Sequence, residues 1–248
     1  MNETLSEPTR PGVAGTEAPA ARSERSLEEF WDNKILHWED SAYGPVPAAP
    51  LARVFHNLRS SIRARLNLTA GILAPYLQSY TRVLDLGCGS GILGERLLGE
   101  SPCRYEGIDL SGRACERARE RLASFEGRAR ITRAAALETP WPDADIVVAL
   151  GLLDWLEASE IDALLARLSK HRFVFSFSEA SPSLAARVHR LWLVRRTQIM
   201  GTPARAHHHS ESYIREVLER HSCGPVRFVR DPAMRFGVLV TNLEENAK

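Results

Sequence analysis

The sequence is short of several features that would place it in a specialised class of protein. Its four cysteines among 248 residues show neither the paired spacing of a metal site nor the density of a disulfide scaffold. No apolar run approaches the roughly 20 residues that a membrane-spanning helix needs, and the polar start lacks the apolar segment of a signal peptide. The formal net charge of +1 lacks the basic excess of a nucleic-acid-binding domain. These absences favour a cytoplasmic protein with no metal site and no nucleic-acid partner.

The composition that is present is that of a globular protein with appendages. Hydrophobic residues make up 44% of the chain and charged residues 25%, which is enough to build a sizeable core. Residues 1–25 carry few large apolar groups, so we expect a disordered tail. Residues 26–79 show helical periodicity and form an expected N-terminal helical cap, and residues 80–243 form the expected core domain.

Within the cap, two helices are predicted on either side of a proline-rich loop. The first begins at Ser26, a suitable N-cap, and presents an aromatic face. The loop covers Ala42–Pro50. The second helix runs from about Leu51 towards Leu77, and its polar face carries a row of basic residues: Arg53, Arg59, Arg63 and Arg65.

Strand patterns alternate with helical patterns through the core domain, which is typical of a doubly wound α/β fold with a mostly parallel sheet. Seven strands are predicted, at 82–86, 105–110, 130–134, 146–150, 172–177, 225–229 and 236–241. Helices are predicted at 92–98, 113–124, 161–168, 183–196 and 211–220. The last two strands are separated only by Arg230–Arg235, which is too short for a crossover helix. We therefore expect a seven-stranded sheet with a C-terminal antiparallel hairpin.

A glycine loop follows the first strand of this domain. The strand ends at Asp85 and opens into a loop with Gly87, Gly89 and Gly91, where bare backbone lets the chain approach a ligand closely. At the end of the next strand, Asp109 offers a carboxylate to the two hydroxyls of a ribose. A dehydrogenase would place a glycine where Ile92 stands. The remaining alternative is a tight turn with no ligand.

These motifs resemble those of the class I, Rossmann-like S-adenosylmethionine-dependent methyltransferases. The resemblance extends from about Tyr80 to Leu243 and includes the apolar fourth strand with the segment after it. It implies that the protein is an enzyme with S-adenosyl-L-methionine as its cofactor. The cofactor-binding residues that it implies are Asp85, Gly87, Cys88, Gly89, Gly91, Asp109, Leu110, Ala136 and Leu150, of which Leu150 offers a backbone carbonyl to the amino group of the cofactor.

One position departs from the pattern of that family. Its members commonly place Gly-Asp after the third strand, where the aspartate contacts the adenine amino group, and this chain has Ala134 and Ala135. The backbone N–H of Ala136 is still suited to the adenine ring, and Glu138 is the expected substitute acceptor. The departure keeps open an alternative in which the site binds the cofactor without turnover, as a regulatory or partner subunit.

The substrate should lie at the carboxyl ends of the strands, beneath the segments that precede and interrupt the core. Ala180–Ser210 contains no acidic residue, so Arg187 and Arg190 are expected to bind a negatively charged acceptor. The alternative is a solvated basic helix face. Further candidates are His189 as a general base, Asp154 as a catalytic or substrate-binding residue, and Trp38 and Tyr43 as a cover of the site.

The expected reaction is O-methylation of a small, acid-bearing molecule. The layout also resembles the magnesium-protoporphyrin methyltransferases in its Arg-rich helix before the glycine loop and in the strand Phe175–Ser178 before a basic segment. RNA or protein methylation is a further alternative, which the near-neutral charge does not favour. The run His207–His209 is expected to be a surface loop, not a metal site. The sequence leaves the acceptor, the methylated atom and the oligomeric state open.

Overall fold

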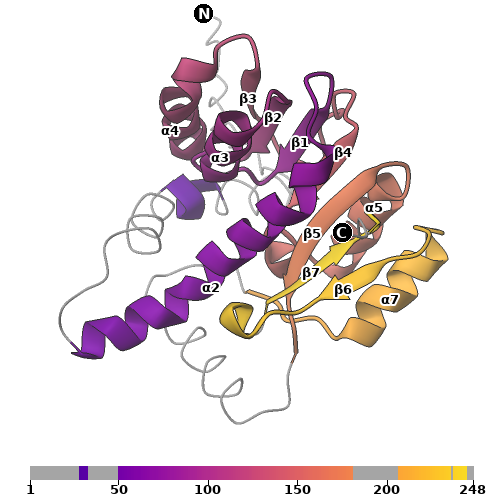
Figure 1. Cartoon of the computed structure of the whole chain (residues 1–248). Coiled ribbons are helices and arrows are strands. Elements are labelled where there is room, and N and C mark those ends of the chain that lie inside the picture. The colour runs from indigo at the N-terminus through magenta and orange to yellow at the C-terminus, as the bar shows by residue number, and fades with distance from the viewer. Residues whose placement is uncertain (1–27, 33–49, 181–205, 236, 245–248) are drawn as a thin grey trace, which may run out of the picture.

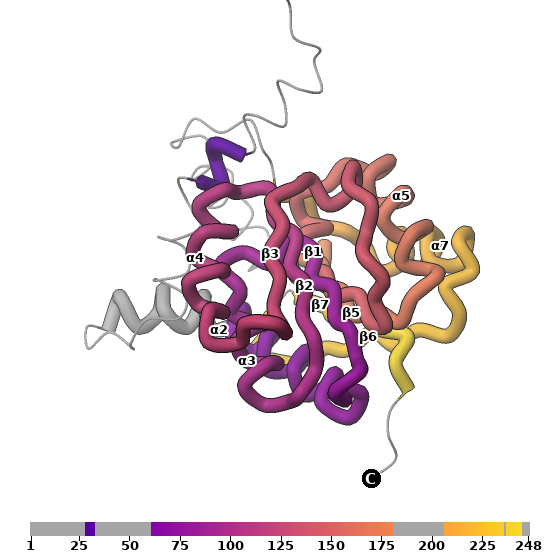
Figure 2. The backbone as a smooth tube through the Cα atoms, turned by 90° about the horizontal axis from the view of Figure 1, so that it is seen from above, coloured from indigo at the N-terminus to yellow at the C-terminus, as the bar shows by residue number. Residues whose placement is uncertain are grey.

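The computed structural model describes residues 28–32, 50–180, 206–235 and 237–244. Within these ranges the protein is a three-layer α/β sandwich (Figure 1). Seen from above, the sheet runs through the middle, with α2, α3 and α4 on one face and α5 and α7 on the other (Figure 2). The described helices include none that is both long and apolar enough to cross a membrane.

The sheet has seven strands in the order β3-β2-β1-β4-β5-β7-β6. Strands β1 to β5 are parallel neighbours, whereas β7 is antiparallel to both β5 and β6. The order reverses direction beside β1, so the carboxyl ends of β1 and β4 flank the crevice in which such sheets bind ligands. The strands are β1 (Arg82–Leu86), β2 (Arg104–Asp109), β3 (Ala129–Arg133), β4 (Ile146–Ala149), β5 (Arg172–Ser178), β6 (Arg227–Val229) and β7 (Gly237–Thr241).

Helices connect and cover these strands. The long α2 (Pro50–Leu73) is followed by a short 3₁₀ turn, η1 (Ala74–Tyr76), before the first strand. Residues 28–32 form a separate piece of helix. The remaining elements are α3 (Ile92–Glu100), α4 (Gly112–Leu122), η2 (Ala123–Phe125), η3 (Leu153–Trp155), α5 (Ala158–Leu168), α7 (Glu211–Arg220) and η4 (Pro232–Met234).

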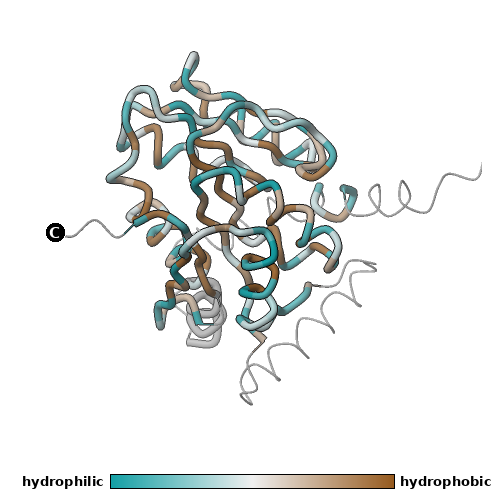
Figure 3. The backbone as a smooth tube through the Cα atoms, turned by 90° about the vertical axis from the view of Figure 1, so that its right-hand side faces the viewer, coloured by the Kyte–Doolittle hydropathy of each residue, from teal (hydrophilic) through white to brown (hydrophobic). Residues whose placement is uncertain are grey.

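Each face of the sheet has its own hydrophobic core. On one face, α2 and α3 pack against Val83, Ile146 and Val174, and on the other, α5 and α7 pack against Phe173 and Phe175. Because both faces are covered, the central strand β4 is apolar at every position, as buried parallel strands usually are. The hydropathy colouring shows this as hydrophobic tube in the interior and hydrophilic tube around it (Figure 3).

All four cysteines of the chain are buried and free. They lie in the glycine loop (Cys88), before β2 (Cys103), in α4 (Cys115) and after α7 (Cys223). Burial raises the pKa of each thiol, to about 11 for Cys115. These thiols therefore stay protonated at neutral pH and behave as small core side chains.

The expected fold is confirmed, and the differences are small. The seven strands occur where they are predicted, within two residues at each end, and β6 and β7 form the expected antiparallel hairpin. The hairpin also inserts β7 between β5 and β6, which the sequence pattern does not specify. The predicted tail at 1–25, the N-cap Ser26 and the helix at 183–196 lie outside the described residues.

Candidate cofactor and substrate site

The glycine loop after β1 is held in a left-handed conformation that requires glycine. Gly87, Gly89 and Gly91 have φ values of 72°, 54° and 76°, a region that other residues rarely enter. A Cβ at Gly91 would also lie 3.1 Å from Ala118 Cβ in α4. From the same helix, Arg121 Nε donates a hydrogen bond of 2.9 Å to the Ser90 carbonyl. Two residues of α4 therefore hold the loop in this conformation.

Asp109, at the end of β2, faces this loop. One oxygen of its carboxylate accepts a hydrogen bond of 2.8 Å from the Gly89 N–H, and the other accepts one of 2.9 Å from the Ser111 N–H. Each carboxylate oxygen has two lone pairs, so both retain capacity for a second donor. Burial raises the pKa of Asp109, and the two backbone donors oppose that shift. Asp109 is thus a fixed acceptor beside the glycine loop, which suits a pair of ribose hydroxyls.

Asp85 lies behind the loop and is buried. Its carboxylate accepts a hydrogen bond of 2.7 Å from the hydroxyl of Tyr105, a fully buried residue of β2. Burial raises the pKa of Asp85 to about 7, and the Tyr105 hydrogen bond only partly offsets this effect. The Tyr105 ring also fills the space beside Gly94 of α3, where a Cβ would lie 2.6 Å from it. Asp85 and Tyr105 together support the loop from within the core.

The loop after β3, where the family resemblance places the adenine, is fastened by Arg167 of α5. The guanidinium donates hydrogen bonds to the carbonyls of Ala136, Leu137 and Thr139, at 3.3, 2.9 and 3.0 Å. It also stacks over the Trp141 ring, 3.8 Å from the ring centroid. The indole N–H of Trp141 donates to the Ala136 carbonyl at 2.7 Å. The backbone of this loop is therefore oriented without the aspartate that the family usually has, and Glu138, the expected substitute, is exposed.

The helical piece at 28–32 contacts three strand ends at the same edge of the sheet. Glu28 pairs with Arg133 at the end of β3, and the Asp32 carboxylate accepts a hydrogen bond of 2.5 Å from the Ser111 hydroxyl after β2. Beyond β4, Trp155 packs against Trp31, with ring centroids 4.8 Å apart. This helix therefore lies at the carboxyl ends of β2, β3 and β4, as a cover of the site would.

Beyond β4, Asp154 joins the loop to the end of β5. Both oxygens of its buried carboxylate accept from Ser178, one from the backbone N–H at 2.7 Å and one from the hydroxyl at 2.8 Å. Burial raises its pKa, while Ser178 and the charges of Arg65 and His209 lower it. The Asp154 carboxylate thus fastens the loop after β4 to the end of β5, and its catalytic role stays a prediction.

The run His207–His209 is not the surface loop that the sequence favours. All three residues are half-buried. His209 pairs with the end of β5 through its backbone, and its Nε2 lies 3.0 Å from the Leu153 carbonyl. The backbone N–H of His207 donates to the Asp154 carbonyl at 2.6 Å. In the part of the chain that the structure describes, no group of His, Cys, Asp or Glu is arranged to hold a metal ion.

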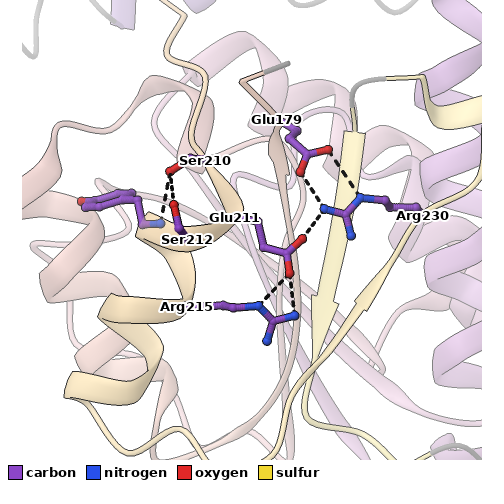
Figure 4. Close-up of polar contacts among 7 residues, drawn as sticks. Glu179, Ser210, Glu211, Ser212, Arg215 and Arg230 are labelled. Carbon is purple, nitrogen blue, oxygen red and sulfur yellow. Dashed lines mark hydrogen bonds and ion pairs between the residues drawn. The ribbon is translucent and has the colours of Figure 1, made fainter. Parts of the chain in front are cut away.

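An ion-pair network fixes the same corner from outside (Figure 4). Arg230, before η4, binds Glu179 at the end of β5, 2.6 Å away, and also Glu211 at the start of α7. Glu211 in turn binds Arg215 at 2.5 Å. In addition, the Ala180 N–H donates to the His209 carbonyl at 2.9 Å. These contacts together hold the chain positions on either side of residues 181–205 close to each other.

A guanidinium from α2 reaches the ends of β4 and β5. Arg65 donates a long hydrogen bond of 3.4 Å to the Ser176 hydroxyl, which also accepts one of 2.8 Å from the Gly151 N–H. Gly151 has a φ of 73°, and a Cβ there would lie 2.9 Å from the Arg65 guanidinium. Glycine at 151 therefore lets the arginine lie directly against the loop after β4.

The structure brings together most of the residues that the sequence singles out for the cofactor. The loop glycines, Asp85 and Asp109 meet at the tips of β1 and β2, while Leu150 and Ala136 lie at the ends of β4 and β3. The candidates Trp38, Tyr43, Arg187, His189 and Arg190 lie outside the described residues. Tyr105, Trp155, Arg167 and Ser176 are not predicted from the sequence, because each acts through a partner on another element of the fold.

Comparison with known proteins agrees with this geometry. Residues 83–172 match the sequence profile of the family described as "Methyltransferase domain". A curated relative, 27-O-demethylrifamycin SV methyltransferase of Amycolatopsis mediterranei (strain S699), is 31% identical over 130 residues. That alignment covers 50% of this chain and 42% of the relative, so the chain matches less than half the length of that enzyme.

Two solved structures share the fold over most of their length. Magnesium protoporphyrin IX methyltransferase from Synechocystis PCC 6803, with bound SAH, superposes with a TM-score of 0.65 at 15% identity, covering 88% of this chain and 98% of that one. Geranyl diphosphate methyltransferase, in complex with GPP and sinefungin, gives a TM-score of 0.62 at 15% identity and covers 89% and 98%. Residues 83–172 thus match a methyltransferase-domain profile, and the chain shares the Rossmann-like fold of these two solved structures.

Proposed function

We propose that the protein is an S-adenosylmethionine-dependent methyltransferase that methylates an oxygen of a small, acid-bearing molecule. The observation that carries this proposal is the hydrogen bond between the Gly89 N–H and Asp109. It fixes a left-handed glycine loop and an acidic strand end side by side, in an arrangement suited to the amino-acid and ribose parts of the cofactor. The methyltransferase-domain match over residues 83–172 supports the same reading.

The residues present fit this cofactor, each through its own chemistry. The Asp109 carboxylate accepts from ribose hydroxyls, and the Leu150 carbonyl accepts from the amino group. The Ala136 N–H, oriented by Arg167 and Trp141 through the carbonyl of the same residue, donates to the adenine ring. When bound, the cofactor supplies an electrophilic methyl group on a sulfonium sulfur.

The chain has three tasks in such a transfer. It aligns the acceptor oxygen with the carbon–sulfur bond, keeps water out, and provides a route for the acceptor proton. Methyl transfer forms a carbon–oxygen bond, breaks the carbon–sulfur bond and leaves S-adenosylhomocysteine. Aromatic packing of Phe30 and Trp31 on Trp155 supports the exclusion of water at this edge, and His189 remains the proposed base.

The proposal is tested in two steps with the full chain. Calorimetric titration should show binding of both S-adenosylmethionine and S-adenosylhomocysteine, and absence of binding at millimolar concentration would reject the proposal. Incubation with methyl-labelled cofactor and fractionated metabolite extracts should then transfer label to an acidic small molecule. Binding without transfer to any fraction would favour the non-catalytic alternative, which the missing adenine-contacting aspartate at Ala135 keeps open.

A further inference from the structure

Among the described residues, Arg65 is a cation that forms no ion pair with a carboxylate. Its side chain is half-buried between α2 and the loop after β4. Among the described residues its one hydrogen bond is the 3.4 Å contact to Ser176. A guanidinium has five N–H donors, so most of them remain available.

Asp154 interacts electrostatically with Arg65 but accepts no hydrogen bond from its guanidinium. The charge of Arg65 lowers the pKa of Asp154, but the two hydrogen bonds that the Asp154 carboxylate accepts both come from Ser178. No ion pair joins the two side chains among the described residues. A half-buried cation without a paired anion is costly, and proteins rarely keep one without a use.

The place to which Arg65 reaches is the ligand edge of the sheet. Ser176 lies near the carboxyl end of β5, and Gly151 follows Leu150 directly after β4. Leu150 is the residue proposed to accept from the amino group of the cofactor, and in an amino acid the carboxylate is bonded to the same carbon as that amino group. The acceptor must approach the same strand ends.

We propose that Arg65 is a carboxylate-binding residue of this site, positioned by Ser176 and given room by Gly151. This inference rests on the proposed function for its choice of ligand. The planar fork of a guanidinium suits a carboxylate through two parallel hydrogen bonds. The carboxylate has two possible sources, the amino-acid end of the cofactor or the acid group of the acceptor.

The experiment compares Arg65→Gln, Arg65→Lys and the matched control Arg130→Gln, which removes an exposed arginine of the edge strand β3. Three probes are titrated: S-adenosylhomocysteine, its decarboxylated analogue, and benzoate on protein with and without S-adenosylhomocysteine. If the cofactor supplies the carboxylate, Arg65→Gln weakens S-adenosylhomocysteine at least about tenfold and leaves the decarboxylated analogue unchanged. If the acceptor supplies it, the variant weakens benzoate alone. Arg65→Lys should retain part of the affinity for S-adenosylhomocysteine or benzoate, whichever ligand Arg65→Gln weakens.

Thermal melting separates this role from a structural one. A guanidinium without a protein carboxylate contributes little to folding, so Arg65→Gln should melt at or above the temperature of the wild type. A clear fall in melting temperature, or affinities for S-adenosylhomocysteine and benzoate that match the wild type, would overturn the inference. Failure of the wild type to bind S-adenosylhomocysteine would reject the proposed function instead, while the benzoate titration would still decide the role of Arg65.

Discussion

The two halves of the sheet edge are built in different ways. At the tips of β1 and β2, the contacts that hold the glycine loop join residues that are near in sequence, such as Gly89 with Asp109 and Asp85 with Tyr105, each pair 20 positions apart. The contact of Ser111 with Asp32, 79 positions away, comes from the helical piece at 28–32. At the tips of β4 and β5, the contacts join distant segments, such as Arg65 with Ser176 at 111 positions and His209 with Leu153 at 56. The first half is a compact local motif, whereas the second is assembled from three parts of the chain.

This difference suggests a division of labour between the halves. A motif closed by backbone N–H groups depends on few side chains and suits a ligand that never changes. An edge assembled from α2, the loop after β4 and the segment before α7 can change its lining without disturbing the glycine loop. We expect substitutions in the first half to alter cofactor binding most, and those in the second to alter the choice of acceptor.

The largest effect is expected from Gly89→Val. A β-branched residue at a φ of 54° is strained and would block the close approach of a ligand. S-adenosylhomocysteine binding, measured by calorimetry, should be lost at millimolar concentration. The matched control is Gly127→Val, which has a φ of 83° and open space around it, and should lose stability without losing binding. Retained affinity in Gly89→Val would contradict the role of the loop.

A smaller loss is expected from Asp109→Ala. The variant removes an acceptor for two ribose hydroxyls, and each charge-assisted hydrogen bond contributes about 1.5–3 kcal/mol. The dissociation constant of S-adenosylhomocysteine should rise at least tenfold while circular dichroism remains native. Asp109→Asn, which keeps one acceptor oxygen, should fall between the two proteins. An Ala variant that binds as well as the wild type would show that the ribose lies elsewhere.

A moderate effect is expected from Arg167→Ala, which frees the loop after β3. Three hydrogen bonds to backbone carbonyls disappear, each contributing about 0.5–1.5 kcal/mol. The melting temperature should fall by several degrees, and S-adenosylhomocysteine affinity should fall about threefold because the Ala136 N–H is no longer oriented. Arg167→Lys lacks the planar fork and should restore only part of both. Unchanged affinity in a destabilised Ala variant would limit Arg167 to a structural role.

The smallest effect on ligand binding is expected from Asp85, which should instead give a pH dependence of folding stability. Burial raises its pKa from 3.8 to about 7, so the folded state holds a proton that the unfolded state has released between these values. Wild-type stability therefore decreases as pH rises from about 4 to about 7 and carries a constant penalty above that. Asp85→Asn has no such penalty and can still accept from Tyr105. Its advantage in melting temperature should grow up to about pH 7, and a difference that is independent of pH would contradict the shift.

The difference between local and long-range contacts also explains how much of the fold and of the site can be predicted from the sequence. Strand ends, the glycine loop and Asp109 follow from local patterns: apolar runs bounded by glycine, and an acid at a strand tip. Nothing local indicates that Arg167 fastens the loop at Ala136, or that Asp154 is occupied by Ser178, since both depend on which helices and strands become neighbours. His209 shows the limit most clearly, because three adjacent histidines suggest an exposed loop, whereas the backbone of His209 pairs with the end of β5 and the run is half-buried.

The buried thiols allow the opening of this protein to be followed by the rate of their chemical modification. Because all four cysteines are protected in the folded state, a thiol-reactive dye should modify them only when the chain opens locally or globally. Cys88, which lies in the glycine loop, would then report the opening of the first half. A ligand that binds only the folded protein slows the opening-dependent labelling in proportion to its occupancy. Candidate ligands can thus be ranked by the labelling rate at Cys88, before any acceptor is known.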